Sequence, residues 1–155
     1  MPLALGVENS DMTKDPHFQA LENMYLDAPI NAFYDPRIEV SEAEAIVEIE
    51  VSKKLFHSNA VHGSVYFKML DDAAFFAASS LEKEVFLLTT SFTTYLTRPV
   101  SSGILRSVGR VVNQNKSQLI AEAVVYDSQG KEVGRGSGIF VRGRVPLREV
   151  PGYTA

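Results

Sequence analysis

The segment HGSVYFKMLDDAAFF, residues 62–76, decides how the rest of the chain must be arranged. It predicts a helix from about His62 to Ser80 that is apolar on almost every side. A helix of that kind must be covered by other elements over most of its surface. Yet it carries two adjacent carboxylates, Asp71 and Asp72, in its middle. Aspartate is almost never fully buried unless it is paired, so these two residues require an explanation.

The residues around this helix favour a curved antiparallel sheet. Residues 45–51 alternate between apolar residues and glutamates, which indicates a strand with one solvated face. Four later stretches, rich in β-branched and aromatic residues, indicate strands over 85–100, 104–114, 117–127 and 133–143, joined mainly by hairpin-like turns. Strands grouped after a helix favour the α+β class, and one antiparallel sheet that curves around the central helix would cover it.

Residues 17–28, between two prolines, have apolar residues at helical spacing and predict an extra N-terminal helix. The segment NAFYDP that follows is expected to be a turn. Residues 144–155 contain two prolines and are not expected to continue the sheet. The expected organisation is a flexible lead-in over 1–16, a single domain over 17–145 and a C-terminal tail over 146–155.

The composition excludes several classes of protein. The 155 residues, 45% of them hydrophobic, suit one domain with a core, and the net charge of −4 disfavours a broadly basic nucleic-acid-binding surface. The chain has no cysteine, so it has neither disulfides nor a thiol nucleophile. Its three histidines lack a metal-ligand spacing, and no metal or other cofactor is expected. Without an apolar stretch that spans a bilayer or a secretory pattern, a cytoplasmic protein is expected.

The order of motifs resembles the hotdog-fold acyl-CoA thioesterases of the PaaI-like (4HBT) superfamily. His62-Gly63-Ser64 stands where that family has H-G-G at the start of its central helix, and Asp71 is the acidic residue nine positions after the histidine. YLTRPVSSGILRSVGRVV (95–112) and AVVYDSQGKEVGRGSGIFV (123–141) resemble the family's third-strand region and closing hairpin. The resemblance covers residues 38–143 and implies a hotdog fold and hydrolysis of an acyl-CoA thioester.

The chain departs from the family pattern at two positions. Ser64 replaces the second glycine, which narrows the groove or adds a hydroxyl group. Phe56 replaces an asparagine that many relatives have six residues before the histidine, with His57 and Asn59 nearby. The part of the site that orients substrate or water is therefore expected to be built differently.

Thioester hydrolysis needs hydrogen-bond donors for the carbonyl oxygen and a base or nucleophile. The free amides and the dipole of a helix N-terminus supply the donors, and Gly63 lets a substrate approach that backbone closely. Asp71 is assigned as the base or nucleophile. His62 is interpreted as shaping the turn by hydrogen bonding. The resemblance also implies that Thr89 positions the attacking water, although a one-residue slip would put Thr90 or Ser91 there.

Helix geometry then predicts a dimer. Gly63 and Asp71 are eight residues apart, which is roughly 12 Å along a helix axis. An aspartate side chain cannot bridge that gap, so the two residues of one chain cannot hold the same carbonyl carbon. Two antiparallel helices from two chains would bring each Asp71 to the other Gly63. We therefore expect a homodimer, or a dimer of two such dimers. Neighbours on a helix point about 100° apart, so Asp72 is assigned a structural role, bonded to a backbone amide or to Lys68.

The remaining assignments concern the substrate. Candidate substrate-binding residues are His57, Asn59, Ser64 and Arg98, and the cations Arg106, Arg110 and Lys116 are further candidates for the coenzyme A phosphates. Tyr66, Phe67, Phe75 and Phe76 are expected mainly in the core, with one or two lining an acyl pocket, while His17 and His57 are expected at the surface or in loops. Two alternatives stay open: a non-catalytic acyl-CoA-binding or regulatory module, and a hotdog hydratase or dehydratase, which the absence of H-F-P-x-x-P prolines disfavours.

Overall fold

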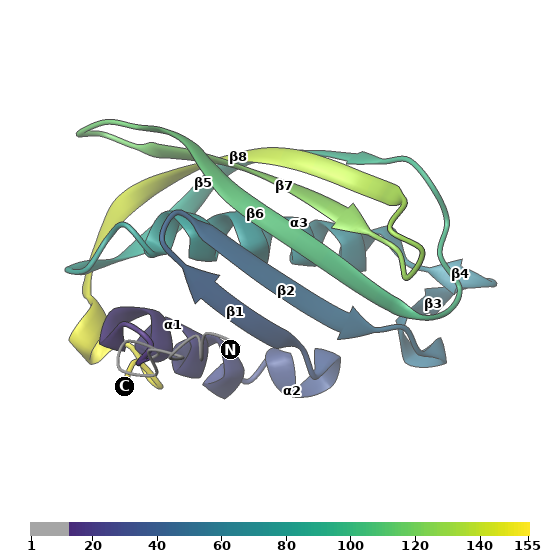
Figure 1. Cartoon of the computed structure of the whole chain (residues 1–155), viewed down its shortest axis with the longest axis horizontal. Helices are drawn as coiled ribbons and strands as arrows, with labels where there is room; N and C mark the ends of the chain where they lie inside the picture. Colours follow the sequence, from purple (N-terminus) through teal and green to yellow (C-terminus); the bar gives the residue numbers. More distant parts are fainter. Residues whose placement is uncertain (1–12) are drawn as a thin grey trace, which may run out of the picture.

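A six-stranded antiparallel sheet curves around one long helix in the computed structural model, which describes residues 13–155 (Figure 1). The helices are α1 (Pro16–Asp27), α2 (Asn31–Tyr34) and α3 (Gly63–Ser79), with 3-10 turns at Lys53–Leu55 and Leu147–Glu149. The strands are β1 (Arg37–Ser41), β2 (Glu44–Glu50), β3 (Phe56–His57), β4 (Ala60–Val61), β5 (Val85–Leu96), β6 (Ile104–Gln114), β7 (Leu119–Tyr126) and β8 (Glu132–Pro146). Most of the expected lead-in, residues 1–12, lies outside the described residues. The α+β class and the central helix are confirmed.

The strand order in the large sheet is β1-β2-β6-β7-β8-β5, and every neighbouring pair is antiparallel. Two hairpins join β6 to β7 and β7 to β8, whereas β5 pairs with β8 and forms one edge of the sheet. Strands β3 and β4 form a separate small hairpin just before α3. Because β5 is an edge strand, one side of its backbone has no partner strand within the described chain.

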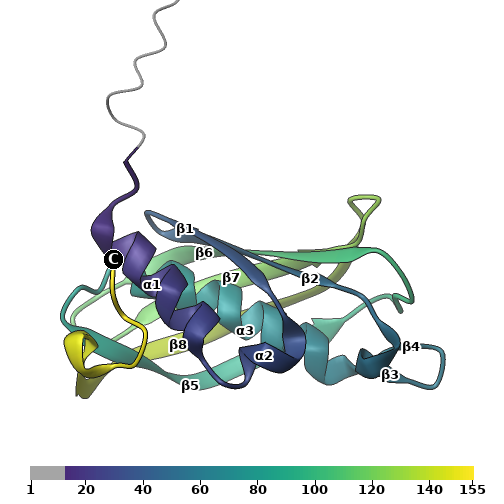
Figure 2. The same ribbon diagram turned by 90° about the horizontal axis from the view of Figure 1, so that it is seen from below.

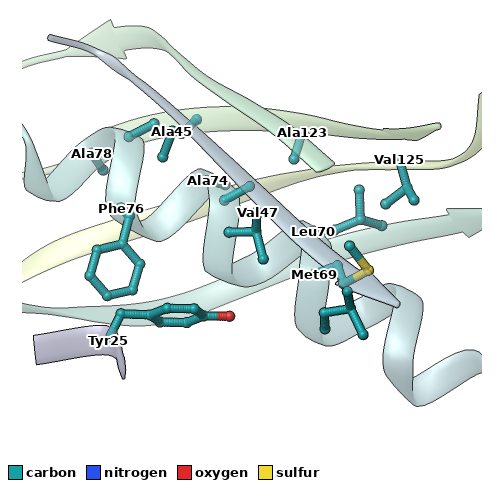
Figure 3. Close-up of a cluster of buried hydrophobic side chains, with 14 of the residues drawn as sticks. Tyr25, Ala45, Val47, Met69, Leu70, Ala74, Phe76, Ala78, Ala123 and Val125 are labelled. Carbon is teal, nitrogen blue, oxygen red and sulfur yellow. The ribbon is translucent and has the colours of Figure 1, made fainter. Parts of the chain in front are cut away.

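Small residues let α3 lie close to the sheet. Ala73, Ala74 and Ala77 are fully buried on α3, and Ala121 is fully buried on β7. Figure 3 shows part of this core, with Leu70 and Ala74 of α3 facing Ala123 and Val125 of β7. The approach is closest at Gly109 of β6, where an added Cβ atom would lie 2.2 Å from the carbonyl oxygen of Ala73.

Replacing Gly109 with alanine is therefore expected to destabilise the protein by about 1–3 kcal/mol or more, because backbone atoms of α3 would have to move. Chemical denaturation measures the change in the free energy of unfolding. The matched control is Val112→Ala on the same strand, whose side chain is half-exposed and should change stability by no more than about 0.5 kcal/mol. Equal stability of Gly109→Ala and the control would contradict the close packing.

Helix α1 lies beside α3, next to the β1 edge of the sheet (Figure 2). Asp15 caps it by accepting the amide of His17 at 2.8 Å. The His17 side chain is buried, contrary to the surface position expected for it. Its Nε2 faces the carbonyl oxygen of Ser79 at 2.8 Å, and its Nδ1 faces the hydroxyl of Tyr153 at 2.6 Å. His17 thus joins α1 to the end of α3 and to the C-terminal segment, which its sequence position did not indicate.

Two further expectations about local structure are wrong. The segment expected to be a turn at residues 31–36 begins with α2, and β1 follows it directly. The last strand, expected to end at residue 143, continues to Pro146, which lies opposite Val85 of β5. Proline is tolerated there because its missing N–H falls at the end of the ladder. The chain then stays attached, because the Leu147 amide donates to the carbonyl of Glu84 at 3.0 Å and the Leu147 side chain is buried.

Candidate active site

The N-terminus of α3 is built around His62, which is the N-cap residue. Its Nδ1 accepts the backbone amide of Ser64 at 3.0 Å, and the Ser64 hydroxyl lies 2.8 Å from the same nitrogen. A ring nitrogen that accepts an amide is unprotonated, so the neutral ring carries its proton on Nε2. This cap holds the turn that places Gly63 as the first helical residue, where backbone amides lack intrahelical partners.

Asp71 lies in the middle of α3 and faces strand β5. The hydroxyl of Thr89 donates a hydrogen bond to Oδ1 of Asp71 at 2.9 Å. Burial is the largest influence on the pKa of Asp71 and raises it; the Thr89 hydrogen bond and the charge of Lys68 lower it, and the charge of Asp72 raises it. The net direction is upward, so this carboxyl group holds its proton more tightly than an exposed aspartate does.

An irregularity in β5 selects which hydroxyl meets Asp71. Thr89 pairs with Phe140 of β8, but the next partner, Ile139, pairs with Ser91, so Thr90 is an extra residue. The Thr90 hydroxyl donates to the backbone carbonyl of Ile139 at 3.2 Å. The bulge therefore leaves Thr89, and neither Thr90 nor Ser91, as the residue whose hydroxyl contacts Asp71.

Asp72 has different partners. Its Oδ2 accepts hydrogen bonds from the Tyr25 hydroxyl at 2.6 Å and from the Lys68 ammonium group at 2.7 Å. Burial raises the pKa of Asp72, while Lys68 and Tyr25 oppose that rise. Lys68 also lies over the rings of Tyr25 and Tyr34, at 5.4 and 5.0 Å from their centroids. The expected pairing with Lys68 is confirmed, and Asp72 joins α3 to α1.

Tyr25 is a contributor that the sequence analysis missed. Its spacing predicted an apolar contact face, and the side chain is indeed buried, packed edge-on against Phe76 at 5.0 Å between ring centroids (Figure 3). A buried tyrosine usually has a hydrogen-bond partner for its hydroxyl. That rule is the signal that would have directed attention to a polar group on the facing helix.

A second group of candidates surrounds Gly63. A pocket of about 280 Å³ is lined by Val61, Gly63, Tyr66, Leu96, Thr97, Arg98 and Pro99. The Tyr66 hydroxyl donates to the carbonyl oxygen of Arg98 at 3.0 Å, which fixes the backbone there. His57 and Asn59 belong to the small hairpin nearby and are exposed, as expected for His57, and the rings of His57 and His62 lie 6.2 Å apart. The structure thus brings Gly63 and Arg98 together.

The other cations lie elsewhere. Arg106 and Arg110 are on the face of β6 that points away from α3, where they line a hollow of about 820 Å³ on the outer side of the sheet. Arg110 pairs there with Glu44 at 2.9 Å. Lys116 lies in the turn between β6 and β7. These three candidates for phosphate binding do not line the pocket at Gly63.

A larger pocket adjoins Asp71. It has a volume of about 440 Å³ and lies between α1, α3, β5 and the C-terminal segment. Its lining includes Asp71, Asp72 and Thr89, together with Phe75 and Phe76 of α3 and Phe86 and Leu88 of β5. Phe75 and Phe76 therefore line a pocket, whereas Phe67, expected mainly in the core, is 43% exposed and packs edge-on against Phe92.

Residues 13–155 contain neither a cluster of metal-binding side chains nor a membrane-spanning helix. No cluster of three or more histidine, cysteine, aspartate or glutamate side chains there could hold a metal ion. No helix in that part of the chain is long and apolar enough to cross a membrane.

Helix α3 thus begins at His62-Gly63, carries the Asp71 carboxylate eight residues after Gly63 and lies within a curved sheet. The model of a family described as the thioesterase superfamily matches residues 58–134, which contain the whole of α3, with Gly63 and Asp71, and strands β5, β6 and β7. The chain belongs to the thioesterase superfamily. None of the curated proteins compared with the chain matches it.

Solved structures of other proteins share the fold of this chain. The PaaI protein of Escherichia coli, from the phenylacetic acid degradation operon, superimposes with a TM-score of 0.75 at 20% identity over 85% of this chain and 99% of that one. A thioesterase family protein from Silicibacter pomeroyi superimposes with a TM-score of 0.71 at 21% identity over 81% of this chain and 98% of that one. A putative esterase from Mycobacterium tuberculosis superimposes with a TM-score of 0.71 at 21% identity over 76% of this chain and 98% of that one. At these identities the likeness establishes the shared hotdog fold alone.

Proposed function

We propose that this member of the superfamily is an acyl-CoA thioesterase whose active sites are shared between two subunits. The observation that carries the proposal is the Asp71 carboxylate, held by Thr89 beside an apolar pocket, roughly 12 Å along the helix from Gly63. A carboxylate in a partly desolvated pocket is suited to general-base or nucleophilic chemistry.

In the proposed reaction, the thioester carbonyl oxygen accepts a hydrogen bond from the backbone amide of Gly63 of the partner subunit. Asp71 either takes a proton from a water that attacks the carbonyl carbon, with Thr89 positioning that water, or attacks the carbon itself. The carbon–sulfur bond then breaks, and coenzyme A leaves as the thiol after protonation. In the general-base route the carboxylic acid is already formed when this bond breaks. In the nucleophilic route the bond cleavage leaves a mixed anhydride between the acyl group and Asp71, and water then hydrolyses it to the carboxylic acid and free Asp71. Donors aimed at the developing oxyanion supply a large share of such catalysis.

The surface around the site supports a second subunit. Strand β5 is a sheet edge, and it exposes three large hydrophobic side chains, Leu88, Tyr95 and Leu96. Phe67 is exposed on α3, four residues before Asp71. Exposed apolar side chains next to an unpaired strand edge favour association with another copy of the same chain. Arg98, in the pocket at Gly63, is our candidate for a coenzyme A phosphate contact, with Ser64, His57 and Asn59 around the entrance.

The direct test measures release of free thiol from a panel of acyl-CoA thioesters with the purified protein. Turnover that depends on Asp71 supports the proposal. Tight binding without turnover would favour a non-catalytic acyl-CoA-binding module, and hydration of an enoyl-CoA without thiol release would favour a hydratase. Sedimentation equilibrium at assay concentration measures the assembly. An active monomer would contradict the shared site, and the measurement also separates a dimer from a dimer of dimers. The cytoplasmic location stays a prediction.

The pH dependence of hydrolysis should report Asp71. The reactive form is the carboxylate, so kcat/KM should fall as the pH decreases through the raised pKa of Asp71. Thr89→Val removes the hydrogen bond that stabilises this carboxylate, which raises the pKa further and moves the acidic limb to higher pH. Thr90→Val is the matched control, because the hydroxyl of Thr90 contacts a backbone carbonyl instead. An unchanged limb in Thr89→Val would contradict the assignment.

A further inference from the structure

The pocket beside Asp71 is lined mainly by apolar side chains, with one polar corner and a few further polar residues. Phe75 and Phe86 pack against each other at 5.4 Å between ring centroids, and Leu88 and Phe76 extend the same wall. The polar corner is formed by Tyr25, Lys68 and Asp72. Asp71 and Thr89 line the same pocket, so a group that occupies it lies next to the proposed reacting carbon.

The charges in this pocket do not suit the phosphates of coenzyme A. Lys68 is the cation among its described lining residues, and it is already paired with Asp72 at 2.7 Å and stacked on two tyrosine rings. Asp27, Asp71 and Asp72 make the lining acidic. Phosphate groups need free cations or amide donors, so the pocket suits the uncharged end of the substrate.

Segments from both ends of the chain complete the walls of the pocket beside Asp71. The linker between α1 and α2 contributes Ala28 and Ile30, and the C-terminal segment contributes Val150 and Pro151. Both segments lie outside residues 58–134, which match the family. A Cβ atom added at Gly152 would lie 2.7 Å from the Cβ of Asp27, so the two segments are in close contact. The volume of about 440 Å³ is near the lower end of the range of about 300–1,000 Å³ typical of ligand pockets.

We propose that this pocket holds the acyl group of the thioester, in the same subunit that supplies Asp71, and that the α1–α2 linker and the C-terminal segment restrict it to compact acyl groups, a short alkyl chain or a single ring. The proposal rests on the proposed thioesterase function. Coenzyme A itself would lie on the other subunit, along the pocket that contains Gly63 and Arg98. Each substrate would then be recognised by two chains, and acyl specificity would depend on residues that the family motif does not contain.

The test measures binding of S-ethyl-CoA and S-hexyl-CoA, thioethers that cannot be hydrolysed, by titration calorimetry. Ala28→Leu and Val150→Phe each reduce the volume of the pocket, and the two residues belong to separate walls. Each should weaken S-hexyl-CoA about tenfold more than S-ethyl-CoA, since one methylene group in a confined pocket changes affinity by about tenfold or more. Val112→Leu, on the outer face of the sheet, is the matched control and should change the affinity for neither thioether. Thermal unfolding checks that the variants fold, and Ala28, at a partly exposed helix end, is the more tolerant position.

The outcomes separate this inference from the proposed function. The inference would be overturned if the pocket variants lost affinity for both thioethers equally, or if the wild type did not bind S-hexyl-CoA. Either result would count whatever the thiol-release assay shows. Selective weakening of S-hexyl-CoA supports the inference even if the wild type hydrolyses no thioester, in which case the proposed catalysis fails and the pocket is a binding site.

Mixed dimers test whether the acyl group and Asp71 belong to one subunit. A Gly63→Val chain paired with an Asp71→Asn chain retains one intact site, made from Asp71 of the first and Gly63 of the second. Ala28→Leu added to the first chain should lower the ratio of hexanoyl-CoA to acetyl-CoA hydrolysis about tenfold. The same change in the second chain should leave the ratio unchanged. The reverse pattern would place the acyl group on the other subunit and overturn the assignment.

Discussion

Replacing Asp71 with asparagine is expected to lower kcat for acyl-CoA hydrolysis by about 10²–10⁴-fold, the range typical of a removed general base, and by more if Asp71 is the nucleophile. Asparagine keeps the size of the side chain and can still accept the hydrogen bond from Thr89, so the fold and the pocket should be retained. The measurement is thiol release under saturating substrate, beside the affinity for S-hexyl-CoA. We expect that affinity to stay near the wild-type value.

Substitutions of two other carboxylates, one distant and one adjacent, make this prediction specific. Glu122→Gln, on the exposed face of β7, controls for the loss of one negative charge and should leave turnover unchanged. Asp72→Asn changes the adjacent residue, whose carboxylate is occupied by Tyr25 and Lys68, and should reduce turnover far less than Asp71→Asn. Wild-type turnover in Asp71→Asn, or an equal loss in Asp72→Asn, would contradict the role of Asp71.

The sequence predicted the elements whose signals are local. The helix from Gly63 to Ser79 is apolar over many residues, and the later strands are long and end at clear turns, so their patterns are distinctive. Strand β1, five residues long at the edge of the sheet, was missed because its alternation is too brief to separate from the turn before it. The two prolines of residues 144–155 predicted that the last strand ends at residue 143, although the end of a ladder allows a strand to include Pro146.

Within the site, the sequence predicted residue types and positions along the helix but not contacts between distant segments. The Asp71–Thr89 hydrogen bond depends on a bulge in β5, which exists only in the pairing with β8. The bond between Tyr25 and Asp72 joins residues 47 positions apart, and no motif connects them. The pocket walls at Ala28 and Val150 likewise come from opposite ends of the chain. Such features follow from tertiary packing, which periodicity along the sequence does not report.

Because Gly63 and Asp71 of one chain are too far apart to share a site, we expect that mixing two inactive variants, one changed at each residue, restores hydrolytic activity. Gly63→Val places a branched side chain at the first residue of α3, where an added Cβ atom already lies 2.9 Å from Leu96, and blocks approach to the backbone amide. We expect a loss of hydrolysis of on the order of 10²–10³-fold, the range found when one oxyanion donor is lost. Mixing the variant with Asp71→Asn after dissociation and reassociation should recover about a quarter of wild-type activity, because half of the dimers are mixed and each has one intact site.

This recovery distinguishes a shared site from one contained in a single chain. If Gly63 and Asp71 of the same chain formed the site, every chain in the mixture would carry a defect, and mixing would restore nothing. Each variant dissociated and reassociated alone is the matched control and must stay inactive. Because roughly 12 Å of helix separates the two residues, a site within one chain would require α3 to break between Gly63 and Asp71. Failure to recover activity, with mixed dimers shown to form by differential tagging, would therefore contradict the shared site and with it the role given to Gly63.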